Sequence, residues 1–269
     1  MQLLKGKEVA EYIESEIYWN RNSETKTLLL IVNKDAHPSV SYAKTLEKLA
    51  KELEIPTKIL WIDDNTDEQH LCYILNGYHY ESDVRSILPL MPFPKHINAK
   101  KVLEYISPYH DVDGIANKGY HNGNINNLGG TPTACVEIMK HYGIDYVGKN
   151  VVIINRSDVV GMPLANYLIR QGATVTVCHS KTQNLAEHTK RADILIVAVG
   201  KADFITQDMV NPDCVIIDVG INFKDGKICG DVSDDVVVKA KTPVPGGVGV
   251  VANMAIMRKH LMGDFYENA

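Results

Sequence analysis

The sequence predicts an α/β protein with two domains, the second of which holds a doubly wound parallel sheet. Its length of 269 residues is long for a single α/β domain and sufficient for two, each with its own core. In the second half, short runs rich in β-branched residues alternate mostly with helical patterns, at 151–154, 174–178, 194–199 and 215–219. This alternation is typical of a Rossmann-like sheet with helices on both faces.

The first half alternates strands and helices as well. Buried strands are predicted at 27–32, 57–62 and 84–88, and helices at 3–19, 40–53, 67–77 and 100–105. The stretch 117–130 is rich in glycine and asparagine, which marks a domain boundary. We therefore expect an N-terminal domain at 1–118, a Rossmann-like domain at 119–249, and a helix within 250–269 that packs back on the first domain.

The helix predicted at 40–53 has one apolar face. Ser39 can cap its first turn, because a serine hydroxyl accepts a hydrogen bond from a free backbone N–H. The apolar stripe that follows consists of Leu46, Leu49, Ala50 and Leu53. Tyr42 stands one turn above Leu46, so it lies on the same face as the stripe.

Composition excludes several classes of protein. The net charge of −5, with mixed signs, leaves no sustained basic surface for nucleic acid. No run of roughly 18 apolar residues could span a membrane, and the first residues lack the apolar core of a secretory signal. The five cysteines are scattered without a C-x-x-C pair, which favours reduced thiols over zinc ligands or disulfides. We expect a cytoplasmic protein without a metal site.

The turn that follows the strand at 151–154 is the first candidate site. A tight loop from Asn155 leads directly into a helix that begins near Gly161. Free backbone N–H groups and the positive end of the helix dipole would face a pyrophosphate there. However, only Gly161 is glycine, so the turn does not match G-x-G-x-x-G. On this turn alone, a nucleotide site and an ordinary strand-to-helix connection both remain open.

Several further segments agree in order and spacing with one family. They are Ser39-x-x-Tyr42, Pro92-x-Pro94, Asp111-Val112-Asp113-Gly114, Thr131-Pro132, Arg156-Ser157-x-x-Val160-Gly161-x-Pro163, His179-Ser180-Lys181-Thr182, Asp218-Val219-Gly220-Ile221-Asn222, Gly230-Asp231-Val232 and 242–249 (TPVPGGVG). With them the chain resembles the methylenetetrahydrofolate dehydrogenase/methenyltetrahydrofolate cyclohydrolase family over nearly its whole length. The resemblance implies oxidation of 5,10-methylenetetrahydrofolate to the methenyl compound, a folate-binding cleft between the domains, and a homodimer.

The resemblance also implies roles for particular residues. Tyr42 and Asp113 are the expected catalytic residues and also bind the folate substrate. The other residues expected to bind folate are Pro245, Gly246 and Gly247. The residues expected to bind the cofactor are Asn155, Arg156, Ser157, Ser180 and Ile221. Each has a plainer interpretation as well: Tyr42 could cap a core stripe, Asp113-Gly114 is a common turn, and Arg156 could be a solvated surface residue.

The cofactor is expected to be NADP rather than NAD. Ser180 and Lys181 follow the second strand of the Rossmann-like half, where folds specific for NAD carry an acidic residue. Together with Arg156 on the turn, they favour a 2′-phosphate. His179 precedes them, but a histidine there is more often packed or exposed than catalytic, and we assign it no role.

The chain departs from the family pattern at the catalytic residues. The family lysine four residues after the tyrosine is Leu46 here, and the family glutamine two residues before the first proline is Leu90. Hydrolysis of the methenyl compound needs a group that transfers protons, and an alkyl side chain cannot do so. We therefore expect the replacements to impair the hydrolysis before they impair the oxidation. A non-catalytic folate-binding or nucleotide-binding paralogue is the alternative, whereas the 243–247 loop (PVPGG) argues against an enzyme of shikimate-dehydrogenase type.

Asn155 is a third departure, because it replaces a family glycine. Asparagine there must either adopt a positive φ or hold the pyrophosphate away from the backbone. We therefore expect replacement of Asn155 by glycine to tighten cofactor binding or to leave it unchanged.

Overall fold

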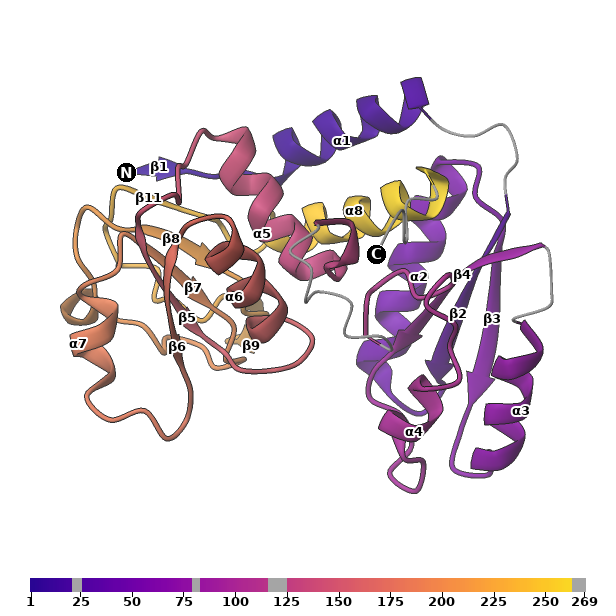
Figure 1. The fold of residues 1–269 in the computed structure, drawn as a ribbon. Coiled ribbons are helices and arrows are strands. Elements are labelled where there is room, and N and C mark those ends of the chain that lie inside the picture. The colour runs from indigo at the N-terminus through magenta and orange to yellow at the C-terminus, as the bar shows by residue number, and fades with distance from the viewer. Residues whose placement is uncertain (21–25, 79–82, 116–124, 263–269) are drawn as a thin grey trace. The chain divides into compact units, whose positions relative to one another are not determined.

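The structure is a computed structural model that describes residues 1–20, 26–78, 83–115 and 125–262 (Figure 1). The chain divides into two compact units. Unit 1 comprises Met1–Glu16 and Gly119–Ala255, and unit 2 comprises Ile17–Lys118 and Ile256–Ala269. By this division the first residues of the expected N-terminal domain, 1–118, fall in unit 1, and the expected domain bounds stay a prediction. The expected boundary at 118/119 lies outside the described residues.

Unit 1 is built on a six-stranded parallel sheet. Its strands are β1 (Gln2–Leu3), β5 (Asn150–Ile154), β6 (Thr174–Cys178), β7 (Ile194–Val197), β8 (Val215–Asp218) and β11 (Ala240–Lys241). The strand order is β1-β11-β8-β7-β5-β6, and every neighbouring pair is parallel. The predicted doubly wound parallel sheet is confirmed. β1 joins its edge through a 2.9 Å bond from Leu4 N to Lys241 O, which explains why the first residues belong here.

The helices of unit 1 lie between its strands along the chain. They are α5 (Gly130–His141), α6 (Gly161–Arg170) and α7 (Leu185–Thr189), with a 3-10 turn at Gln207–Met209. A separate antiparallel hairpin, β9 (Asn222–Lys224) with β10 (Lys227–Cys229), leaves the sheet after β8. β5 and β7 are buried along almost their whole length, because a parallel strand covered on both faces is apolar at every position.

Unit 2 is a smaller α/β layer with three parallel strands in the order β3-β2-β4 (Figure 1). The strands are β2 (Thr27–Asn33), β3 (Thr57–Ile62) and β4 (Val84–Leu90). The helices within or entering this unit are α1 (Gly6–Asn20), α2 (His37–Glu52), α3 (Glu68–Tyr78), α4 (Ala99–Leu103) and α8 (Val248–Met262). The central strand β2 is buried from Leu28 to Asn33 and forms the middle of the core.

The start of α2 differs from the expectation that Ser39 caps the helix. Ala36 occupies the N-cap position without a side-chain bond, and Pro38 lies in the first turn, where its missing N–H costs nothing. Ser39 is inside the helix and buried, and its hydroxyl donates to the backbone oxygen of Met91 at 2.8 Å. The serine therefore ties α2 to the segment after β4 instead of capping the helix.

A buried histidine ties the end of α8 to the sheet of unit 2. His260 Nε2 lies 2.9 Å from the backbone oxygen of Lys26, and Nδ1 lies 2.8 Å from the hydroxyl of Ser86. Because a carbonyl oxygen only accepts, Nε2 donates; in the neutral ring, which the lowered pKa favours, Nδ1 accepts from the Ser86 hydroxyl. Burial lowers the pKa of His260 to about 4.

Among the described helices, none combines the length and the apolar character that crossing a membrane requires.

Candidate functional site

A cavity of about 520 Å³ lies at the carboxyl ends of β5, β6 and β7. Four of the five residues expected to bind the cofactor line it: Asn155, Arg156, Ser157 and Ser180. Each follows directly after a strand of the parallel sheet, which is where doubly wound folds bind ligands. Ile221 is not among the lining residues and is 65% exposed. Its role in cofactor binding stays a prediction.

Asn155 holds the turn between β5 and α6 by its side chain. Its Oδ1 accepts from the backbone N of Ser157 (2.8 Å), the hydroxyl of Ser157 (2.7 Å) and the backbone N of Gly161 (3.1 Å). Its Nδ2 donates to the backbone oxygen of Ala198 at 2.6 Å, just after β7. The asparagine therefore joins the turn to the neighbouring strand.

This geometry changes two expectations about the turn. Asn155 is not among the residues with positive φ, so the left-handed alternative does not apply. The amides of Ser157 and Gly161 are bonded to Asn155, and the amide of Val160 is bonded to the hydroxyl of Ser157 at 3.1 Å. The expectation that these amides face an anion freely is therefore wrong. A Cβ on Gly161 would lie 2.0 Å from the backbone oxygen of Asn155, so glycine is required there.

Two further basic side chains line the cavity: His179, to which the sequence analysis assigned no role, and Lys201, which it did not consider. Lys201 Nζ lies 5.8 Å from the ring centroid of Phe204. His179 Nδ1 accepts from the backbone N of Lys181 at 3.1 Å, so a neutral ring carries its proton on Nε2. His179 could have been found from its place in the 179–182 motif. The only sequence signal for Lys201 was its position shortly after a predicted strand.

A buried aspartate shapes the loop that carries Lys201. Asp231 is fully buried, and its carboxylate accepts from the backbone N of Val199 (2.6 Å), Gly200 (3.1 Å) and Lys201 (2.8 Å). Asp218 in turn holds the backbone of Asp231, with 3.0 Å between Asp218 Oδ1 and Asp231 N. Burial raises the pKa of Asp218 to about 6. This pair of carboxylates fixes one wall of the cavity.

The loop with Pro245, Gly246 and Gly247 packs on the start of α1 within unit 1. Gly6 N donates to Gly246 O at 2.8 Å, and a Cβ on Gly6 would lie 2.1 Å from Gly247 O. Gly246 has a φ of +97°, a conformation that L side chains rarely adopt. Packing thus explains these glycines without a ligand, and their folate-binding role stays a prediction.

Unit 2 brings together the two expected catalytic residues. Tyr42, on α2, is half-buried, and its pKa is raised by burial and by the nearby carboxylate of Asp113. The phenol therefore keeps its proton at neutral pH. Leu46, one turn further along α2, has no exposed surface, and Leu90 at the end of β4 is 3% exposed. Both leucines belong to the core, as their replacement of polar family residues indicated.

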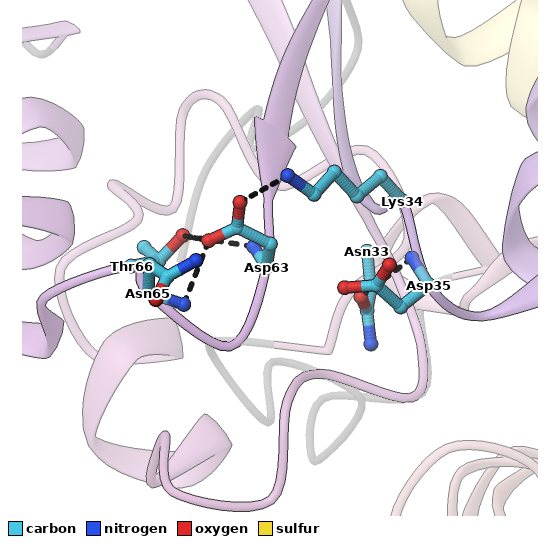
Figure 2. A network of polar contacts seen from close by, with 6 residues as sticks. All are labelled: Asn33, Lys34, Asp35, Asp63, Asn65 and Thr66. Carbon is cyan, nitrogen blue, oxygen red and sulfur yellow. Dashed lines mark hydrogen bonds and ion pairs between the residues drawn. The ribbon is translucent and has the colours of Figure 1, made fainter.

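A polar network fixes the loop that leads into α2 (Figure 2). Lys34 forms an ion pair with Asp63, which follows β3. The Asp63 carboxylate also accepts from the backbone N of Asn65 at 2.8 Å and the hydroxyl of Thr66 at 3.2 Å. The bond from Lys34, and then that from Asn65, lower the pKa of Asp63. The network holds the start of the helix that carries Tyr42.

Fold and cavity together define a two-unit α/β protein with a cavity at the strand ends of its larger parallel sheet. Two family models match consecutive parts of the chain. The tetrahydrofolate dehydrogenase/cyclohydrolase catalytic domain matches residues 4–113, and the NAD(P)-binding domain of the same family matches residues 129–265.

Individual relatives agree over nearly their whole length. Bifunctional protein FolD of Pelotomaculum thermopropionicum is 39% identical and covers 96% of this chain and 95% of its own. The crystal structure of the bifunctional FolD enzyme of Campylobacter jejuni matches with a TM-score of 0.92 at 33% identity, covering 98% of both chains. The Trypanosoma brucei enzyme, complexed with NADP cofactor and inhibitor, matches with a TM-score of 0.86 at 27% identity, covering 97% and 96%.

The chain belongs to the tetrahydrofolate dehydrogenase/cyclohydrolase family. This result confirms the resemblance drawn from the motifs, and it makes the second half an NAD(P)-binding domain of an enzyme family.

Proposed function

We propose that this protein oxidises 5,10-methylenetetrahydrofolate to 5,10-methenyltetrahydrofolate and transfers the hydride to NADP. The observation that carries the proposal is the cavity lined by Asn155, Arg156, Ser157 and Ser180 in the NAD(P)-binding domain. Hydride transfer from a methylene carbon between two nitrogens needs positioning rather than proton transfer, because the nitrogen lone pairs stabilise the cation that forms. An apolar environment around Leu46 and Leu90 does not prevent this step.

NADP is favoured over NAD by the charges at the cavity. Arg156 and Lys201 supply cations, and Ser180 supplies a hydroxyl, all suited to a 2′-phosphate. The segment after β6, His179 to Thr182, contains no acidic residue that would pair with a free ribose hydroxyl. The NADP bound by the Trypanosoma brucei relative agrees with this choice.

Hydrolysis of the methenyl product to the formyl compound is the second proposed step. The names of the relatives, which call them bifunctional, support it. The step requires an ionisable group near the folate, and α2 offers only Leu46 at the family position. Activity would therefore depend on a group from another element of unit 2.

One assay tests both steps against the alternative of a non-catalytic binding protein. The full chain is mixed with methylenetetrahydrofolate and either NADP or NAD, and reduced nicotinamide and methenyl product are followed separately. We expect reduced nicotinamide with NADP. Disappearance of added methenyltetrahydrofolate above the uncatalysed rate reports the hydrolysis. Binding of folate and NADP without any reduction would favour the non-catalytic alternative.

The first prediction concerns the 2′-phosphate. Arg156→Ala should raise the KM for NADP by roughly 10-fold to 100-fold and leave the KM for NAD nearly unchanged, because a charge-assisted bond to the phosphate contributes about 1.5–3 kcal/mol. Steady-state rates with each cofactor measure this. Arg170→Ala, at the end of α6 in the same unit, is the matched control. Equal losses with both cofactors would show that Arg156 does not read the 2′-phosphate.

We also propose that the protein acts as a homodimer in the cytoplasm. The β9–β10 region exposes the apolar side chains of Ile221 (65%), Phe223 (78%) and Ile228 (41%), which supports a partner surface there. All five cysteines are free, which suits a reducing compartment. Sedimentation of the full chain would measure the assembly, and a monomer at assay concentration would contradict the homodimer.

A further inference from the structure

A buried lysine lies at the end of α8 in unit 2. Lys259 is 8% exposed, and among the described residues it is the only lysine or arginine that is buried. Lysines are almost never buried without a partner, because the ammonium group loses its hydration. No family motif recognised in the sequence includes this position. Lys259 therefore stands apart from the other described lysines and arginines by its burial.

Neighbouring contacts fix where this lysine lies. The next residue, His260, is bonded to Ser86 on β4, and Ile87 is bridged in parallel to Asp111. The backbone N of Ile87 also donates to His110 O at 2.7 Å. The last turns of α8 and the segment that begins at His110 therefore both contact β4, at the neighbouring residues Ser86 and Ile87.

The charges around the ammonium match this placement. Burial lowers the pKa of Lys259 to about 8, while Asp113 and then Asp111 act in the opposite direction, and Arg258 on the same helix lowers the pKa further. The ammonium is thus the main form at neutral pH. Two carboxylates of one segment, Asp113 and Asp111, stabilise its charge.

Asp113 links this lysine to the expected folate-binding residues. The same carboxylate acts on the phenol of Tyr42, on α2. The three lysines of α2, Lys44, Lys48 and Lys51, are all exposed, and the position one turn after Tyr42 is the fully buried Leu46. The positive charge beside Asp113 therefore comes from α8.

We infer that Lys259 is a positioning residue for folate, which orients the carboxylate of Asp113 and supplies a positive charge that α2, with Leu46 at the family position, does not. The inference rests on the proposed function for the identity of the ligand. An oriented carboxylate accepts hydrogen bonds from the amino and ring N–H groups of a pterin. A fixed ammonium beside it also gives the folate site a charge that disappears at alkaline pH.

The test compares Lys259→Met, Lys259→Arg and the control Lys48→Met, an exposed lysine on α2, in the full chain. Calorimetry measures tetrahydrofolate binding without cofactor, and initial rates with NADP are measured from below to above pH 8. We expect Lys259→Met to weaken tetrahydrofolate binding at least about tenfold and to leave the KM for NADP unchanged. Lys259→Arg should recover most of the affinity, and Lys48→Met should match the wild type.

The pH profile separates positioning from packing. In the wild type, kcat/KM for the folate should fall as the pH rises through about 8, where Lys259 loses its charge. In Lys259→Arg this fall should be absent, because arginine stays charged. A profile that falls equally in both proteins would overturn the inference.

A double-mutant cycle tests whether Lys259 acts through Asp113. Adding Lys259→Met to Asp113→Asn should cost little further affinity for tetrahydrofolate, whereas independent effects would add. Full additivity, or unchanged binding in Lys259→Met, would overturn the inference. A wild type that binds tetrahydrofolate without reducing NADP would remove the proposed oxidation alone, and these binding comparisons would still decide the inference. A wild type that binds no tetrahydrofolate would overturn both.

Discussion

At the scale of single residues, the turn between β5 and α6 shows what a polar side chain does at a position where the family has a glycine. Four hydrogen bonds from Asn155 close the turn and tie it to the backbone after β7. Gly161 is needed because it lies against the backbone and side chain of Asn155. The two positions thus act together: Asn155 forms the hydrogen bonds that close the turn, and Gly161 has no side chain that would collide with Asn155.

The second prediction follows from the hydrogen bonds of Asn155. It is opposite to the expectation drawn from the sequence, that Asn155→Gly tightens cofactor binding or leaves it unchanged. Asn155→Gly should weaken NADP binding about tenfold and lower the free energy of unfolding of unit 1 by about 1–3 kcal/mol, because buried polar partners lose their bonds. Titration calorimetry with NADP measures the affinity. Asn150→Gly, at the exposed start of β5, is the matched control. Unchanged or tighter binding in Asn155→Gly would restore the original expectation.

At the scale of elements, the sequence pattern predicted most helices and strands and missed the two-residue strands. The strands at 57–62 and 174–178 were predicted with the bounds observed, since both are rich in apolar and β-branched residues. β1 and β11 have two residues each, too few for any period to be visible. Their pairing is decided by contacts between the first residues and positions near 240, which a local pattern does not contain.

The candidate site was predictable to a similar degree. Strand ends and the family motifs located Asn155, Arg156, Ser157 and Ser180 at one cavity. Lys259 was missed, because a lysine on an apolar helix looks like a solvated residue unless the helix is known to be buried on every side. The bonds made by Asn155 were missed as well, since the sequence states which residue replaces glycine but not where its side chain points.

The third prediction concerns the attachment of α8 to the sheet of unit 2. The folded-state pKa of His260, about 4, lies below its ordinary value of 6.5, so the neutral ring contributes stability that is complete above pH 6.5. This contribution, about 3 kcal/mol, should be lost as the pH falls from 6.5 toward 4. Urea unfolding measures it through Trp19 and Trp61, the only two tryptophans, which both belong to unit 2.

The control for this prediction separates His260 from the other titrating groups. His260→Leu should be less stable at neutral pH, because Ser86 and Lys26 lose a partner, but it should lose less stability on acidification than the wild type. His70→Leu, an exposed histidine on α3, should follow the wild type. An equal acid response in His260→Leu and wild type would show that other groups cause the loss.

At the scale of the whole molecule, neither unit is a continuous stretch of chain. Unit 1 takes Met1–Glu16 from the start, and unit 2 takes residues after Ala255 from the end. The two family models follow the chain rather than this exchange, since the catalytic model begins at residue 4 and the NAD(P)-binding model ends at residue 265. Cutting the chain between the two matched segments would therefore divide both cores.

The exchange of ends has a consequence for synthesis on the ribosome. β1 is made first but waits for β11, at Ala240–Lys241, before it has a partner in the sheet. All three strands of the sheet of unit 2 have been synthesised by Leu90. The hydrogen bonds of Ser86 and of the Lys26 backbone oxygen to His260 can form only after α8 has been synthesised. Domains usually fold as they emerge from the ribosome. In this chain, neither core can be completed until α8 has been synthesised, because both units include residues of α8. A ribosome that stops before Lys259 therefore yields a product that lacks both Lys259 and His260, the residue that bonds α8 to Ser86 and Lys26.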